Sequence, residues 1–159
     1  MIVRKVKMSD LEAVYAVYQD FNADLYKYFG NGYEAMRRHK EPVEKMTKDA
    51  LLKDMRRRKA MFFVAEEDGD IVGYVSAKII DYKNAHLDRP KTGLIEDLAV
   101  KKEHRGKRVS SKLMQEVYSW FKMNDVKLYE LKVIAANPAV EIYKKWGFEI
   151  KRYDMMRFA

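Results

Sequence analysis

The chain has 159 residues, the size of one ordinary domain, which is enough to bury a core without disulfides or a metal. It has no cysteine, which excludes a disulfide framework, a thiolate nucleophile, an iron–sulfur cluster and a cysteine-ligated zinc. The net charge of +8 favours an anionic ligand such as nucleic acid, phosphate or a phosphorylated cofactor. With no signal-peptide pattern and no membrane-length apolar run, we expect one domain, residues 1–159, in the cytoplasm.

Two kinds of pattern define the first half of the chain. Alternating residues indicate strands, apolar residues at helical spacing indicate helices, and Asp68-Gly69 between two strand-like stretches is typical of a hairpin turn. In chain order we expect a strand at 2–7, a helix from Leu11, a loop at 29–42, a helix from Pro42 to about Arg58, and hairpin strands at 61–67 and 71–80.

The second half of the chain alternates between strands and helices. We expect a strand at 94–100, a helix at 109–123, a strand at 127–135, a short helix from Asn137-Pro138 to Gly147, and one or two strands in 148–158. This alternation implies at least one parallel pair, whereas the hairpin implies antiparallel pairs. The sequence therefore predicts an α/β domain with a mixed sheet.

A basic loop joins two of these elements. The strand at 94–100 continues into KKEHRGKR (101–108), and VSSKL (109–113) then starts a helix. Such a unit directs the free N–H groups of the helix start, the helix dipole and the loop cations at whatever occupies the loop. The loop suits a phosphate group, and the alternative is a loop that is simply solvated.

The stretch from Leu94 to Phe148 resembles the GNAT acetyltransferase superfamily. The family's Arg/Gln-x-x-Gly-x-Gly/Ala signature corresponds to residues 105–110, and its Asn…Tyr-x-x-x-Gly-Phe segment corresponds to Asn137 through Tyr143 to Phe148. The strand IEDLAV is similar to that of diamine (polyamine) acetyltransferases in particular. The resemblance implies a mostly antiparallel sheet of six to seven strands, flanked by about four helices, with a V-shaped split between the strands at 94–100 and about 128–134.

This resemblance also implies acetyl-CoA as co-substrate, no metal, and direct transfer of the acetyl group to a primary amine. The diphosphate would lie on the loop and helix start, and the pantetheine arm would pair with the strand edge, where a backbone N–H would stabilise the oxyanion. The implied cofactor-binding residues are Leu98, Ala99, Val100, Arg105, Gly106, Lys107, Arg108, Val109, Ser110, Ser111 and Asn137.

Arg108 departs from the family pattern, because it stands where the signature has a glycine. We expect it to have an ordinary negative φ, since it comes just before the helix. On that basis its side chain should point outward and contact the phosphates of the cofactor rather than block the site.

Two residues are predicted to carry the protons. The resemblance assigns Tyr143 as the acid that protonates the leaving thiolate, although an aromatic residue of this kind also suits a core position. Glu96 is predicted as the base that takes the amine proton through water, with a water chain lacking a fixed residue as the alternative. Because Glu96 and Asp97 are adjacent on a strand, we expect them to face opposite sides of the sheet.

The acceptor is left open by the sequence. The resemblance places the acceptor side roughly at Tyr15–Val43 and Tyr153–Phe158, where aromatic residues and carboxylates suit an amine cation. A small amine, a polyamine, an amino acid, an antibiotic and a protein N-terminus all fit. A degenerate CoA-binding domain and a basic nucleic-acid-binding module are the rival functions; we expect neither a nucleic-acid nor a membrane partner, and a homodimer is left open.

Overall fold

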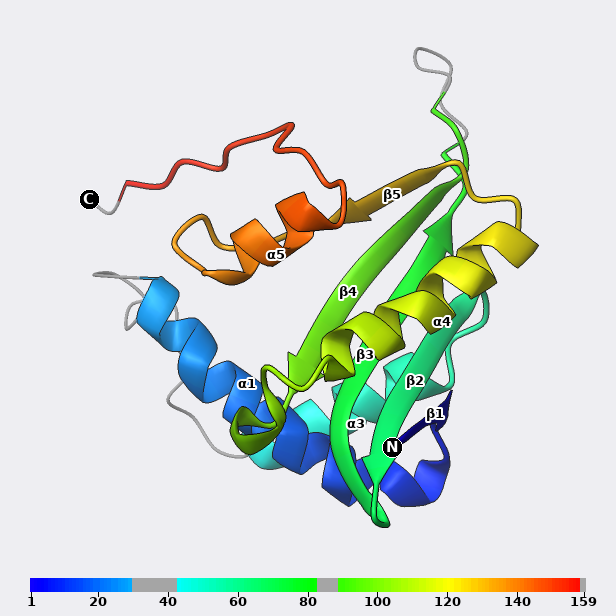
Figure 1. Cartoon of the computed structure of the whole chain (residues 1–159), viewed down its shortest axis with the longest axis vertical. Helices are drawn as coiled ribbons and strands as arrows, with labels where there is room; N and C mark the ends of the chain where they lie inside the picture. The colour runs from blue at the N-terminus through cyan, green and yellow to red at the C-terminus, as the bar shows by residue number, and fades with distance from the viewer. Residues whose placement is uncertain (30–42, 83–88, 158–159) are drawn as a thin grey trace.

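The structure is a computed structural model that describes residues 1–29, 43–82 and 89–157 (Figure 1). Most of the expected loop at 29–42, the expected helix start at Pro42 and the last part of the expected final strand lie outside these residues. Within the described ranges, none of the helices is long and apolar enough to cross a membrane.

Strands and helices follow the expected order. They are β1 (Ile2–Lys5), α1 (Leu11–Tyr28), α3 (Val43–Met55), β2 (Ala60–Glu67), β3 (Asp70–Ile80), β4 (Thr92–Val100), α4 (Val109–Met123), β5 (Leu128–Leu131) and α5 (Ala139–Lys145), with short 3-10 turns at Met8–Asp10 and Lys102–His104. The sheet order is β1-β2-β3-β4-β5; β4 and β5 are parallel, and the other neighbouring pairs are antiparallel. The predicted mixed, mostly antiparallel sheet is confirmed.

Helices cover both faces of the sheet, with α4 on one face and α1 and α3 on the other (Figure 1). The helix at 109–123 was predicted from its apolar spacing, and its buried side chains are those that repeat every three or four residues: Val109, Leu113, Met114, Val117, Trp120 and Phe121. On the opposite face, Val14 and Val17 of α1 pack with the stacked rings of Phe62 and Tyr74. Two cores therefore fix the sheet between the helix layers.

Two glycines let α4 approach the sheet closely. A Cβ on Gly93 would lie 2.4 Å from the ring of Phe121, so this ring occupies the space that a side chain would need. A Cβ on Gly73 would lie 2.9 Å from the carbonyl oxygen of Ala99 and 3.2 Å from Val109 Cγ1. Gly73 of β3 therefore sets how near β4 and the start of α4 lie to β3.

The predicted strand count was too high, because the described residues form five strands rather than six or seven. The stretch 148–157 has no strand, and β5 stops at Leu131 instead of continuing to 135. Residues of this tail are largely exposed, with Tyr153 at 76% and Met155 at 93%. Since β5 offers an edge of only four residues, it gives the tail little to pair with in the described chain.

Candidate active site

The sheet opens between β4 and β5. The two strands pair from Thr92 with Leu128 to Ile95 with Leu131, and β4 then continues to Val100 without its neighbour. The predicted V-shaped split is therefore present from Glu96 onward, while the two strands stay joined at its base. A split of this kind exposes one backbone edge of β4.

Leu98 and Val100 present their backbone groups at this open edge. The N–H of Lys101 donates to Val72 O of β3 at 2.9 Å, and neighbouring residues in a strand point their backbone groups in opposite directions. Val100 accordingly faces away from β3, and its carbonyl oxygen accepts a hydrogen bond from Arg105 Nε at 3.1 Å. The groups predicted to pair with an extended amide chain thus point into the split.

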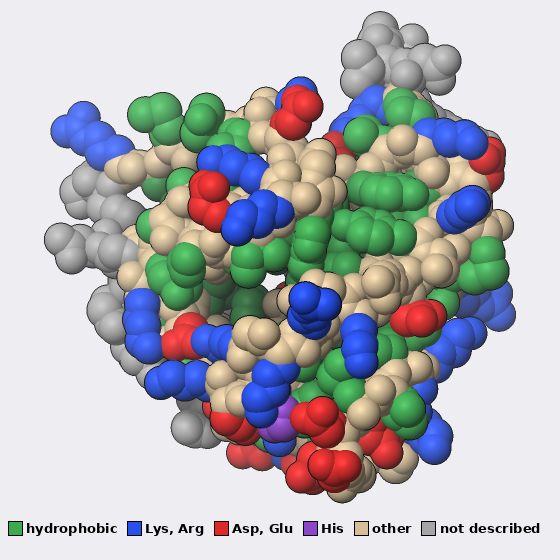
Figure 2. Space-filling view, viewed as in Figure 1, with side chains coloured by type: hydrophobic (Ala, Val, Ile, Leu, Met, Phe, Trp, Pro, Cys, Tyr) green, Lys and Arg blue, Asp and Glu red, His purple; other side chains and the backbone are tan. Residues whose placement is uncertain are grey.

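The loop beyond β4 leads directly into the start of α4. Backbone N–H groups from Gly106 to Ser111 have no acceptor within the ranges described, and Gly106 has a φ of 77°. Lys102, Arg105, Lys107 and Arg108 are exposed around them. Figure 2 shows Lys and Arg side chains near the start of α4 and hydrophobic side chains in the hollow between α4 and α5. Free amides, a helix start and cations together form a site that fits a diphosphate.

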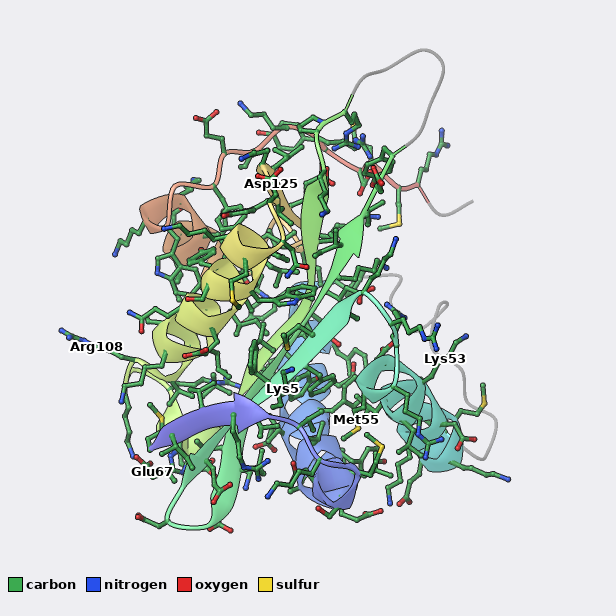
Figure 3. All side chains as sticks on the ribbon, turned by 90° about the vertical axis from the view of Figure 1, so that its right-hand side faces the viewer. Lys5, Lys53, Met55, Glu67, Arg108 and Asp125 are labelled. Atoms are coloured by element: carbon green, nitrogen blue, oxygen red, sulfur yellow. The ribbon has the colours of Figure 1, made fainter. Side chains whose placement is uncertain are left out.

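Arg108 contradicts the expectation for its backbone. Its φ is 61° and its ψ is 18°, which is the left-handed conformation, whereas we expected a negative φ. The reason is that the chain must turn from the loop into α4 at this residue, the turn for which the family signature has glycine. Its side chain is exposed and projects away from the body of the molecule (Figure 3). The outward direction agrees with the expectation, but the residue occupies a strained backbone.

A β-bulge overturns the expected positions of the two carboxylates on β4. Ser76 pairs with Asp97 while Ala77 pairs with Ile95, so Glu96 is an extra residue in the strand. Ile95 and Leu98 consequently both pack on the α4 side. Glu96 and Asp97 therefore face the same side of the sheet, toward α1 and α3, instead of opposite sides.

Glu96 is held by two cations. Arg57, just after α3, donates from Nη1 to Glu96 Oε2 at 2.8 Å, and Lys78 of β3 donates from Nζ to Glu96 Oε1 at 2.5 Å. Arg57 also forms a short ion pair with Asp54 of α3. Both carboxylate oxygens of the predicted base are thus occupied.

Asp97 lies in a different environment. It is half-buried on the strand, and burial, followed by the negative charges of Asp54 and Glu96, raises the pKa of Asp97 to about 6. Its charge also raises the pKa values of Tyr18 on α1 and Tyr74 on β3, where burial is the larger cause. A carboxylate of this kind can hold or release a proton near neutral pH.

Buried hydroxyls accompany Asp97. Tyr74 Oη and Ser76 Oγ are both buried and have no hydrogen-bond partner in the described part of the chain. Ser76 is the direct cross-strand neighbour of Asp97. Unpaired polar atoms in such a position commonly hold an ordered water.

Tyr143 lies on α5, beside the opening. Its ring makes edge contacts with Trp146 and Phe148, at centroid distances of 5.8 and 6.1 Å. Burial raises the pKa of Tyr143, and the charges of Asp97 and Tyr118 raise it further. Tyr143 therefore keeps its proton at neutral pH and lies within electrostatic reach of Asp97.

Two other predicted features have structural partners. Asn137 Oδ1 accepts the N–H of Ala139 at 2.9 Å, which caps the start of α5. Arg105 forms a short ion pair with Asp24 of α1, and hydrogen bonds from Lys27 and Arg105 lower the pKa of Asp24 to about 2. Arg105 thus connects the loop before α4 with α1.

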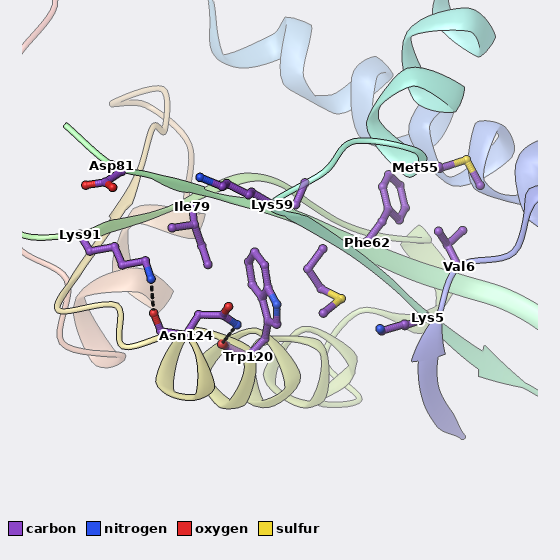
Figure 4. A pocket seen from close by; sticks show the side chains of 12 residues that line it. Lys5, Val6, Met55, Lys59, Phe62, Ile79, Asp81, Lys91, Trp120 and Asn124 are labelled. Atoms are coloured by element: carbon purple, nitrogen blue, oxygen red, sulfur yellow. Dashed lines mark hydrogen bonds between the residues drawn. The ribbon is translucent and has the colours of Figure 1, made fainter. Parts of the chain in front are cut away.

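A separate hollow lies at the far end of α4. It is rimmed by three lysines and floored by apolar side chains, among them Trp120, next to the hydrogen bond from Lys91 Nζ to the carbonyl oxygen of Asn124 (Figure 4). The length of α4, about 22 Å for its 15 residues, separates this end from the basic loop. The split between β4 and β5 is the better candidate for the active site, because Asp97 lies on β4 within electrostatic reach of Tyr143 and the basic loop follows the same strand.

Comparison with known families settles the class of protein. The model of the Acetyltransferase (GNAT) family matches residues 14–148, and the chain belongs to this family. An N-alpha-acetyltransferase from Sulfurisphaera tokodaii is 33% identical over 101 residues, which cover 57% of each chain. The L-amino acid N-acetyltransferase AaaT from Escherichia coli is 35% identical over 95 residues, 55% of this chain and 52% of that protein. The match thus spans little more than half the length of these curated relatives.

Solved structures share the whole fold. A tetramutant of the BH1408 protein from Bacillus halodurans superposes with a TM-score of 0.84 at 20% identity, with both chains covered completely. The PaiA N-acetyltransferase from Thermoplasma acidophilum, solved in complex with coenzyme A, has a TM-score of 0.74 at 19% identity, over 96% of this chain and 92% of that one. These similarities establish the GNAT fold of the chain.

Sequence reasoning missed four residues that shape this site. Asp97 was noted but expected on the opposite side of the sheet from Glu96, because a bulge leaves no signal in a single strand pattern. Arg57 and Lys78 are distant from Glu96 in the sequence, and only the fold brings them to it. A glycine inside the strand-like stretch that contains Gly73 was a usable signal, since strand glycines often mark a close approach.

Proposed function

We propose that the chain is an acetyl-CoA-dependent N-acetyltransferase that moves the acetyl group directly to the α-amine of an amino acid or a peptide. The observation that carries this proposal is the position of Asp97, a half-buried carboxylate where β4 leaves β5, electrostatically coupled to Tyr143. A proton acceptor and a proton donor thus share one opening beside a phosphate-type loop. The names of the two curated relatives support the choice of acceptor, since one is an N-alpha-acetyltransferase and the other an L-amino acid N-acetyltransferase.

The loop and the open strand edge fit coenzyme A. Free N–H groups from Gly106 to Ser111 and four exposed cations suit its diphosphate, and the open edge at Leu98 and Val100 suits its amide chain. When bound, acetyl-CoA supplies an activated thioester. The coenzyme A held by the PaiA structure supports this assignment of the co-substrate. Ala99, Asn137 and the remaining predicted contacts stay predictions.

Asp97 takes the role of proton acceptor in this proposal, in place of the predicted Glu96. Its pKa of about 6 lies about 2 units below that of an α-ammonium, near 8, and more than 4 units below that of a lysine-type ammonium. The transfer therefore costs about 3 kcal/mol for the first and about 6 kcal/mol for the second. An α-amine is accordingly the better-matched acceptor.

Tyr143 takes the role of proton donor. Its raised pKa keeps the hydroxyl protonated until a thiolate develops nearby, and its contacts with Trp146 and Phe148 hold the ring in place. No covalent acyl-enzyme is needed, because the amine itself attacks the thioester. A cytoplasmic location also remains a prediction, and a homodimer is left open.

Acetyl transfer to a panel of acceptors tests the proposal. The panel is a peptide with a free N-terminus, free L-amino acids, a lysine-side-chain peptide blocked at its N-terminus, a polyamine and an aminoglycoside. We expect turnover with the first two classes, and a stability gain of about 2.7 kcal/mol when acetyl-CoA is present at 100 times its Kd.

The rival functions give different results. Stabilisation by acetyl-CoA without turnover on any acceptor would indicate a degenerate CoA-binding domain, for which Arg108 in place of glycine is the specific observation. No stabilisation, together with salt-dependent binding of DNA or RNA, would indicate a nucleic-acid-binding module.

A further inference from the structure

We infer that Arg57 and Lys78 hold Glu96 as a fixed charge beside Asp97, so that Glu96 is a positioning residue and Asp97 alone exchanges the proton with the acceptor. This inference rests on the proposed acetyl transfer and adds a division of labour between the two adjacent carboxylates. We refer to Arg57, Lys78 and Glu96 together as the clamp.

Contacts within the clamp explain why Glu96 is unsuited to proton transfer. Arg57 and Lys78 each hold a different oxygen of its carboxylate, at 2.8 and 2.5 Å. The three side chains are only 23–32% exposed, so the pairs are less screened by solvent than free surface pairs. Glu96 would have to break both charged hydrogen bonds before it could turn toward the opening.

Three elements meet at the clamp. Arg57 follows the end of α3, Lys78 belongs to β3, and Glu96 is the extra residue of the bulge in β4. The clamp therefore fastens the end of α3 to the bulge. Because the bulge turns Asp97 toward α1 and α3, the clamp also fixes the direction in which Asp97 points.

Charged and titratable groups reach Asp97 from every element packed around it. Tyr18 comes from α1, Asp54 from α3, Tyr74 from β3, Glu96 from β4 and Tyr143 from α5. Arg57 and Lys78 lie one step further away, since both are paired with Glu96. Negative charge on Glu96 favours the protonated form of Asp97. By Coulomb's law the clamp cations, which are paired with the neighbouring Glu96, favour the ionised form. Glu96 and the two clamp cations thus shift the pKa of Asp97 in opposite directions.

The clamp predicts that removing its negative charge and removing one of its positive charges shift the titration midpoint of Asp97 in opposite directions. We would titrate the Asp97 side-chain carboxyl by carbon-13 NMR in the full chain and measure the acid limb of kcat/KM. Glu96→Gln should move both midpoints down by about 0.5 pH unit or more, and Arg57→Met should move both up by a similar amount. Activity of Glu96→Gln should fall less than about tenfold, whereas Asp97→Asn should lose at least about 100-fold.

Matched controls separate this effect from a loss of structure. Arg57→Lys keeps the positive charge and should restore the midpoint. Glu66→Gln removes a comparable ion pair, formed with Arg4 at 2.6 Å between β1 and β2, and should leave Asp97 unchanged. If Arg57→Met does not fold, Lys78→Met provides the same test.

Three results overturn the inference: shifts of equal sign in Glu96→Gln and Arg57→Met, no shift in either, or a loss in Glu96→Gln as large as in Asp97→Asn. The NMR titration needs no turnover, so it tests the clamp separately from catalysis. Opposite NMR shifts in a chain that acetylates no acceptor would support the electrostatic clamp and contradict the proposed function.

Discussion

Replacing Asp97 with asparagine should stabilise the fold at neutral pH while it slows acetyl transfer. Asparagine has nearly the same shape but no charge, so it removes the cost of burying a carboxylate among like charges. This combination of greater stability and lower activity is expected only of a residue whose environment is adapted to chemistry rather than to folding.

The magnitude follows from the pKa of Asp97, which rises from an ordinary 3.8 to about 6 in the folded chain. Since the folded pKa is the higher one, the unfolded chain releases this proton first as pH rises. The free energy of unfolding therefore falls between about pH 4 and pH 7, by a total of about 3 kcal/mol at 1.36 kcal/mol per pH unit. Asp97→Asn has no carboxyl at this position, so its free energy of unfolding does not fall in this way. Its free energy of unfolding should therefore exceed that of the natural chain only slightly near pH 4 and by the whole amount above pH 7.

Thermal unfolding from pH 4 to pH 8 measures this difference. For a chain of this size, about 3 kcal/mol corresponds to a rise of about 6–12 °C in Tm. Asp70→Asn, at the hairpin tip, is the control, because it shows how an Asp-to-Asn substitution at a position away from the site changes Tm. The reasoning is refuted if Asp97→Asn and the natural chain show parallel stability curves over this pH range, because Asp97 would then have no raised pKa in the folded state.

Substitutions at three further positions test other parts of the site. Arg108→Gly should raise the free energy of unfolding by about 1 kcal/mol in a denaturant titration, because glycine adopts the left-handed backbone without strain, whereas Arg108→Ala should not raise it. Calorimetry should show that both variants lose about 1.5–3 kcal/mol of acetyl-CoA binding free energy. Tighter acetyl-CoA binding by either variant would contradict a contact between Arg108 and the phosphates. Gly73→Ala should lower the free energy of unfolding by about 1–3 kcal/mol and weaken acetyl-CoA binding, since the new Cβ would lie 2.9 Å from Ala99 O. An unchanged Tm would show that the start of α4 does not pack this closely on the sheet. Tyr143→Phe should lower kcat about 100-fold with acetyl-CoA affinity and Tm nearly unchanged, and a kcat within twofold of the natural chain would remove Tyr143 as the donor.

Much of the fold was predictable because it rests on local patterns. The apolar spacing from Val109 to Phe121 defines α4, and Asp68-Gly69, with φ values of 53° and 88°, forms the turn that its residues favour. The order of strands and helices then restricts the sheet to few topologies. The tail after Gly147 was predicted as one or two strands from its local sequence, but strand formation also needs a partner edge, which is not a local property.

The site was predictable only in part, for a similar reason. The basic loop and the start of α4 are contiguous in sequence, so their juxtaposition could be read directly. The roles of Glu96 and Asp97 depend on one extra residue in β4 and on cations from α3 and β3. Neither is visible in the sequence, because strand alternation assumes a regular register. Arg108 shows the same limit, since its left-handed φ follows from the path of the loop rather than from the residue type.

Single-turnover transfer from radiolabelled acetyl-CoA is the most direct test of the central claim. The full chain, preloaded with labelled acetyl-CoA, would be mixed with a peptide that has a free N-terminus, and protein and peptide would be separated after rapid quenching. We expect the label to appear on the peptide α-amine at the rate at which acetyl-CoA disappears, with none on the protein, and at least about 100-fold more slowly in Asp97→Asn. Label retained on the protein, or no labelled peptide or amino acid while acetyl-CoA stays bound, would contradict direct N-acetyl transfer by this site.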